Sequence, residues 1–162
     1  MKATGATFLL ILESEKVGLL VWSPLAGGLL SGKYSRTQQK PADLRRTNYD
    51  YPIVDKERTW NILDVMVPIT KTHGCSPARL SLAWLLAKPV VTSVIIGAKR
   101  LDQLQDNLAA VELKFTQNEL RQLDEVSALA PEYPGWVLPF QGADRLEIVD
   151  RWERLREASK AH

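Results

Sequence analysis

Two short, nearly unbroken apolar runs stand out along the chain because they have the length of β-strands. They are Gly18 to Trp22 and Val90 to Ile96, and only Thr92 and Ser93 interrupt the second. Runs of this kind are typical of strands buried on both faces within a parallel sheet. The pattern therefore predicts two parallel strands, each covered on both sides.

The segment between the two runs carries apolar residues at helical spacing. Lys56 to His73 has an apolar stripe and ends at Gly74, as expected for an amphipathic helix. Ser76 and Pro77 then have the residue types that favour an N-cap and a first helical position. They predict a second helix that runs towards Pro89.

Further helices are predicted on either side of this central part. For Phe8 to Lys16 the short apolar run does not separate helix from strand, and a helix is favoured. After the second strand, Leu101 to Val111 has a helical stripe, and Thr116 with Glu119 forms a capping box for another helix. The remaining segments predict loops at 35–52 and 130–140 and a charged helix at 143–158.

The order of the predicted elements is strand, loop, helices, strand, helices. This order is typical of an α/β fold with parallel strands. The length of 162 residues favours one domain over residues 1–162. Residues 1–7 are expected to be disordered, and residues 130–162 to form a C-terminal loop and helix.

Composition narrows the class of protein without naming a function. The chain is 45% hydrophobic, and its 21 basic and 19 acidic residues are scattered, which argues against a nucleic-acid or membrane surface. The run FLLIL is too short to span a bilayer. Two histidines and a single cysteine are too few to make a metal set, and we expect a cytoplasmic protein.

The first strand is followed by a glycine-rich loop, SPLAGGLLSGKY, that has the character of a phosphate-binding segment. From Gly27 to Gly32 and Lys33 the spacing matches that of a nucleoside triphosphate loop. That motif also needs a serine or threonine after the lysine and a helix that starts there. Because Tyr34 follows instead, the triphosphate interpretation is the weakest of those considered.

The second strand is followed by SVIIGAKRLDQLQDNL, which predicts the adenosine end of a dinucleotide site. Gly97 ends the strand, and Lys99 or Arg100 can pair with a 2′-phosphate. Gln103 and Asn107 lie one helical turn apart and can present amide groups to an adenine edge.

Together the two loops resemble those of the aldo-keto reductase family. The resemblance implies a (β/α)8 TIM barrel, of which this chain would hold the C-terminal portion, with its last two parallel strands and outer helices. It also implies NADP(H) as cofactor. The cofactor-binding residues it implies are Ser23, Pro24, Leu25, Ala26, Gly28 and Lys33 in the first loop, and Gly97, Ala98, Lys99, Arg100, Gln103, Asp106 and Asn107 in the second.

The family's catalytic aspartate, tyrosine, lysine and histidine belong to earlier strands, so catalytic residues stay unknown here. We expect an NADP(H)-binding, truncated aldo-keto reductase of carbonyl-reducing oxidoreductase lineage, with reduction of a small carbonyl substrate weak or absent. The alternative is a non-enzymatic cofactor-binding or self-assembling module. Open strand edges predict a homo-oligomer in either case.

Overall fold

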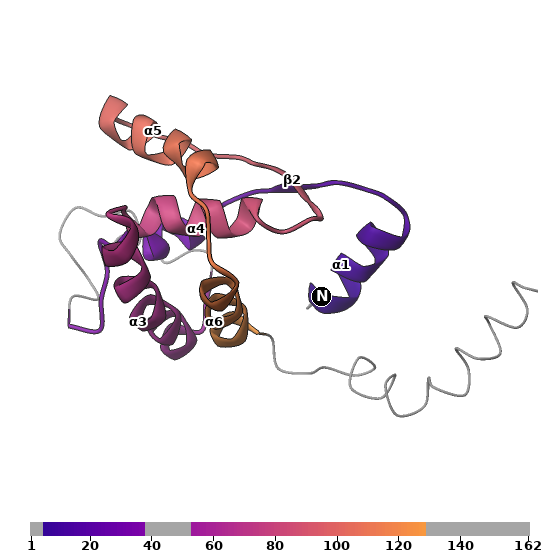
Figure 1. Ribbon diagram of the computed structural model, residues 1–162, viewed down its shortest axis with the longest axis horizontal. Coiled ribbons are helices and arrows are strands. Elements are labelled where there is room, and N and C mark those ends of the chain that lie inside the picture. Colours follow the sequence, from indigo (N-terminus) through magenta and orange to yellow (C-terminus); the bar gives the residue numbers. More distant parts are fainter. Residues whose placement is uncertain (1–4, 38–52, 129–162) are drawn as a thin grey trace, which may run out of the picture. The chain divides into compact units, whose positions relative to one another are not determined.

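The computed structural model describes residues 5–37 and 53–128 (Figure 1). The chain divides into two compact units, residues 1–11 with 129–162 and residues 12–128. The loop expected at 130–140 and the helix expected at 143–158 lie outside the described residues, as does most of the loop at 35–52. The interpretation of residues 1–162 as one domain stays a prediction.

The described elements follow the predicted order. They are α1 (Gly5–Ser14), β1 (Leu19–Val21), the 3-10 helix η1 (Ala26–Ser31), α3 (Lys56–His73), α4 (Pro77–Leu86), β2 (Val91–Val94), α5 (Leu101–Leu108), the 3-10 helix η2 (Ala109–Glu112) and α6 (Gln117–Ser127). The helix favoured for the first apolar run is confirmed. This helix begins at Gly5, inside the segment 1–7 for which disorder was expected.

The two strands form a parallel pair, as predicted. Leu19 lies opposite Val91 and Val21 lies opposite Val94, with an irregularity in register after Leu19. Gly18 allows the two chains to approach closely, because a Cβ atom there would lie 1.9 Å from Thr92 Oγ1. The glycine before β1 is therefore required by the pairing.

Burial of both faces of the strands is contradicted by the structure. Leu20 is 61% exposed, Trp22 is 65% exposed and Ile95 is 51% exposed. The reason is that, within the described residues, the sheet has only two strands, and α4 packs against β2. The apolar residues show which strand faces a larger sheet would bury. They do not show whether another strand or helix packs on those faces.

The caps predicted for three of the helices are present, whereas the helix expected at Leu101 to Val111 is α-helical only to Leu108 and continues as η2. The Ser76 side chain accepts a hydrogen bond from the Arg79 amide at 3.0 Å, and Gly74 ends α3 with a φ of 58°. The capping box of Thr116 and Glu119 is present in full. Glu119 also reaches His73 Nε2 at 2.8 Å, which ties α6 to the end of α3.

The core of residues 12–128 is built around α4. Figure 1 shows α4 between β2 and the pair α3 and α6, and α4 packs against α3, β2, α5 and both 3-10 helices. Its Leu80 and Leu82 are 0% and 1% exposed. One face of α4 joins the main core, whose buried members are Leu29, Tyr34, Trp60, Leu63, Met66, Ile69, Leu80 and Leu123. This core fixes the segments that follow β1 and β2.

Candidate functional site

The two predicted loops leave the same edge of the sheet. The first follows β1 after Val21, and the second follows β2 after Val94, its hydrogen-bonded neighbour. Parallel strands present their carboxyl ends at one edge, where α/β proteins hold ligands. The parallel pairing thus brings the loops together although some 70 residues separate them along the chain.

The first loop has an unusual backbone. Ser23 and Ala26 adopt left-handed conformations, with φ values of 54° and 50°, and Gly27 and Gly28 follow at 67° and 95°. Such conformations cost about 1–3 kcal/mol at a non-glycine residue and gather at functional sites. Turn hydrogen bonds hold the loop: the Ala26 amide donates to the Ser23 carbonyl at 2.9 Å, and the Ser31 hydroxyl donates to the Gly28 carbonyl at 2.6 Å.

The end of the first loop packs against the start of α4. Gly32 has a φ of 81°, and a Cβ atom there would lie 2.8 Å from Pro77 Cγ. No helix begins at Lys33 within the described stretch that ends at residue 37. A triphosphate loop needs a helix whose N-terminus faces the phosphates at this point. The structure therefore argues against the triphosphate interpretation.

The second loop has free space around Gly97, and hydrogen bonds hold its end at the start of α5. A Cβ atom on Gly97 would meet nothing within 4 Å. The Lys99 amide donates to Gln103 Oε1 at 3.3 Å, and Arg100 Nε donates to Asp102 Oδ1 at 2.9 Å. This hydrogen bond raises the pKa of Arg100 and lowers that of Asp102. Because both side chains are well exposed, the pair contributes little and can be exchanged for another anion.

Asp106 connects α5 to the beginning of α4. Its Oδ1 accepts from Arg79 Nε at 3.0 Å and Nη2 at 2.7 Å, and its Oδ2 accepts from the Ser76 hydroxyl. Arg79 thus compensates the carboxylate charge. The nearby Cys75 thiol has a raised pKa, mainly because of burial, with Arg79 opposing, so it is held in the protonated form.

The two loops and the start of α4 enclose one groove of about 550 Å³. This volume lies within the range typical of small-molecule and cofactor sites. The groove is lined by Leu25, Gly27, Gly28, Ser31, Lys33, Tyr34, Ser76, Ala78, Gly97, Lys99, Arg100, Asp102, Gln103, Asp106 and Asn107.

Most of the residues predicted to bind a cofactor meet in this groove. From the first loop these are Leu25, Gly28 and Lys33, and from the second they are Gly97, Lys99, Arg100, Gln103, Asp106 and Asn107. Ser23, Pro24, Ala26 and Ala98 are not among the lining residues. Ser23 and Ala26 shape the turn through their left-handed backbone, and Pro24 lines a different cavity.

The groove also contains residues that the sequence did not reveal as site residues. Ser76 and Ala78 belong to the start of α4, more than 40 residues after the first loop. Their pattern indicated a helix cap, and the packing of Gly32 on Pro77 together with the bond from Ser76 to Asp106 brings that cap to the groove. Gly27, Ser31, Tyr34 and Asp102 lie beside predicted residues in the same loops.

The charge of the groove suits an anion. Within the described ranges no carboxylate forms an ion pair with Lys33 or Lys99, and Arg100 pairs only with its exposed neighbour Asp102. Elsewhere in the described part of the chain, no group of three or more histidine, cysteine or acidic side chains could hold a metal ion. Of the helices that the structure describes, none is long and apolar enough to cross a membrane.

Comparison with known proteins gives a consistent set of relatives. The family model described as "Aldo/keto reductase family" matches residues 6–128. YrpG of Bacillus subtilis, described as an uncharacterized oxidoreductase, is 36% identical over 110 residues, which cover 68% of this chain and 32% of that protein. L-glyceraldehyde 3-phosphate reductase of Escherichia coli K12 is 35% identical over 119 residues, or 70% of this chain and 34% of that protein.

Two further comparisons extend the range of relatives. A probable voltage-gated potassium channel subunit beta of Arabidopsis thaliana is 33% identical over 133 residues, which cover 78% of this chain and 40% of that protein. The crystal structure of a thermostable aldo-keto reductase, Tm1743, has 28% sequence identity and a TM-score of 0.47, and the match covers 74% of this chain and 33% of that one. The chain spans about one third of the length of the first curated relatives it matches.

Proposed function

Because the chain belongs to the aldo/keto reductase family, we propose that the groove between its two loops binds NADP(H). The observation that carries this proposal is the convergence of both loops on one groove of about 550 Å³ with uncompensated lysines. The family resemblance assigns these same two loops to the pyrophosphate and adenosine ends of the cofactor. The chemistry of the groove fits an anionic dinucleotide.

The adenosine end of the cofactor belongs to the second loop in this proposal. Lys99 and Arg100 supply cations for the 2′-phosphate, with Arg100 exchanging its exposed partner Asp102 for the phosphate. Gln103 already uses its Oε1 to accept from the Lys99 amide, which leaves its amide nitrogen to donate to adenine. Asn107 is 9% exposed and forms part of the groove wall.

The pyrophosphate belongs to the first loop. Gly28 lacks a side chain, so the loop backbone can come close to the ligand, and Lys33 supplies a cation. Asp106 lines the groove and has a structural task as well. Its bonds to Arg79 and Ser76 position α5 against α4, and they keep its own negative charge compensated near the phosphates.

When bound, the cofactor supplies the hydride that carbonyl-reducing members of the family transfer to the carbonyl carbon. The family's proton-donating tyrosine and its three partners lie on earlier strands, which are outside the matched loops. General acid catalysis typically contributes about 10²- to 10⁴-fold to the rate. We therefore propose that the 162-residue chain by itself binds NADP(H) but reduces carbonyl compounds weakly or not at all.

A non-enzymatic, self-assembling module is the second candidate, and the exposed strand face favours it. Leu20 lies in β1, and Trp22 and Ile95 directly follow the two described strands; all three side chains are exposed. A second copy of the chain would cover this surface, which gives a homo-oligomer. Cofactor binding and assembly are compatible, since the groove lies at the strand ends.

The test is a calorimetric titration of the purified chain with NADPH, NADP⁺ and NADH, followed by an assay with a reactive aromatic aldehyde. We expect saturable binding of NADPH and weaker binding of NADH. We expect slow or no loss of NADPH absorbance on addition of the aldehyde. Absence of NADPH binding would refute the proposed cofactor, and brisk turnover would refute the proposed loss of catalysis.

A further inference from the structure

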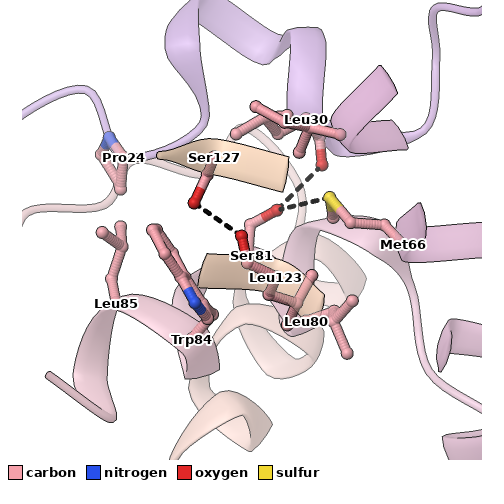
Figure 2. A pocket seen from close by; sticks show the side chains of 10 residues that line it. Pro24, Leu30, Met66, Leu80, Ser81, Trp84, Leu85, Leu123 and Ser127 are labelled. Carbon is pink, nitrogen blue, oxygen red and sulfur yellow. Dashed lines mark hydrogen bonds between the residues drawn. The ribbon is translucent and has the colours of Figure 1, made fainter. Parts of the chain in front are cut away.

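A second, smaller cavity lies on the other side of the first loop (Figure 2). It has a volume of about 80 Å³ and is bounded by the main core helices α3, α4 and α6 together with the loop after β1. Figure 2 shows Pro24, Leu85 and Trp84 along one side and Leu30 and Met66 along another. The cavity is thus distinct from the proposed cofactor groove.

The walls of this cavity are almost entirely apolar. Its two polar side chains are already satisfied within the protein. The Ser81 hydroxyl donates to the Pro77 carbonyl at 2.8 Å, and the Ser127 hydroxyl donates to the Leu123 carbonyl at 2.6 Å. A trapped water needs two to four polar partners, which these walls do not offer. The cavity is therefore suited to an apolar occupant.

The size of the cavity narrows the class of occupant. A volume of about 80 Å³ is far below the range of roughly 300–1,000 Å³ that holds drug-sized ligands. It is about half the roughly 150 Å³ of an apolar cavity that takes up benzene or xenon. A nucleotide is therefore excluded, and the volume suits a compact apolar molecule.

The first loop forms the wall between the cavity and the groove. Pro24 and Leu30 line the cavity, whereas Leu25, Gly28 and Ser31 line the groove. Ser81 Oγ also lies 3.4 Å from the Leu30 carbonyl oxygen, so the loop contacts α4 at the cavity wall. A molecule in the cavity would contact Pro24, which precedes η1, and Leu30 within η1, the turn whose left-handed residues shape the groove.

We propose that this cavity is a binding site for a small apolar molecule, and that η1 responds to its occupancy. The site itself does not depend on the proposed cofactor. The response of η1 follows from shared residues, since the occupant packs on Pro24 and Leu30 and favours the loop conformation that contacts it. Binding of such a molecule in the cavity would thereby change the conformation of the loop that lines the groove.

The experiment follows the full chain by NMR, with xenon as the probe for the wild type. The chain has two methionines, Met1 and Met66, so methyl-labelled methionine gives a cavity signal from Met66 and an internal reference from Met1. The proposal expects a saturable shift of the Met66 methyl signal with xenon pressure. It also expects shifts of the Gly28 and Ser31 amides with the same dependence on pressure.

A matched pair of variants at Leu85 tests the location. Leu85→Phe fills the cavity and should abolish the xenon response, while Leu85→Ala enlarges it and should add saturable binding of benzene. Thermal melts check that each variant is folded. No saturable shift of Met66 in the wild type overturns the site, as does an unchanged response in folded Leu85→Phe. A Met66 shift without any change at Gly28 and Ser31 overturns the response of η1.

Neither readout uses the cofactor. Failure of NADPH to bind therefore leaves this experiment intact, and failure of xenon to bind leaves the proposed function intact.

Discussion

Replacing Lys99 by alanine should weaken the binding of NADPH and leave the binding of NADH almost unchanged. Lys99 lines the groove beside Gly97 and forms no ion pair with a described carboxylate, so its ammonium group is available to a phosphate. NADPH and NADH differ only in the 2′-phosphate. A residue that contacts this phosphate must therefore contribute to the affinity for NADPH and hardly to the affinity for NADH.

The magnitude follows from the type of bond that is lost. A hydrogen bond to a charged group contributes about 1.5–3 kcal/mol, and each 1.4 kcal/mol changes a dissociation constant tenfold. Lys99→Ala should thus weaken NADPH by about 10- to 150-fold and NADH by less than about 2-fold. Arg100→Ala should have a smaller effect, because Asp102 competes for the guanidinium group and the pair is exposed to solvent.

Isothermal titration calorimetry of both cofactors at fixed ionic strength measures these changes. Lys114→Ala is the matched control, because Lys114 is also an exposed lysine but does not line the groove. An equal loss of affinity for NADPH and NADH in Lys99→Ala would show that this lysine does not read the 2′-phosphate. An equal effect of Lys114→Ala would reduce the result to a change of net charge.

Three further predictions concern stability and assembly. Gly32→Ala should destabilise the fold by about 1–3 kcal/mol in urea unfolding, because its φ of 81° and its approach to Pro77 both oppose a side chain, whereas Gly97→Ala should be nearly neutral. Burial opposes the ionisation of Glu119, but bonds from Thr116 and His73 prevail and hold its pKa below the ordinary 4.5. Its contribution to stability is therefore present above about pH 4.5 and lost as the pH falls through the folded value, so Glu119→Gln should flatten that acid limb of the stability curve, and an unchanged limb would contradict it. Trp22→Lys should shift sedimentation at micromolar concentration towards the monomer, since Trp22 directly follows β1 and is 65% exposed, and a wild-type protein that is already monomeric would end the idea of assembly.

The sequence predicted those parts of the fold that depend on local chemistry. The caps at Ser76 and Gly74 and the capping box at Thr116 were recognisable because each rests on residues a few positions apart. The parallel pairing was also predictable, since the helices between two apolar runs imply a crossover. These features need no knowledge of distant neighbours.

Other parts were not predictable because they depend on what packs against them. Burial of Leu20 requires a covering layer, which an apolar run cannot reveal. The left-handed backbone of Ser23 and Ala26 was not predictable, because nothing in a serine or an alanine indicates a positive φ. Ser76 reaches the groove through the packing of Gly32 against Pro77 and through its bond to Asp106, which are contacts between segments distant along the chain.

The central claim is that the loops after β1 and β2 form one binding site. The most direct measurement is an amide NMR titration of the full chain with adenosine 2′,5′-bisphosphate, which carries the 2′-phosphate and adenine without the nicotinamide. The account predicts shifts at Gly97 and Gln103 and also at Gly28 and Ser31, all with one dissociation constant. Shifts confined to one loop, or two different dissociation constants for the two loops, would contradict a single site.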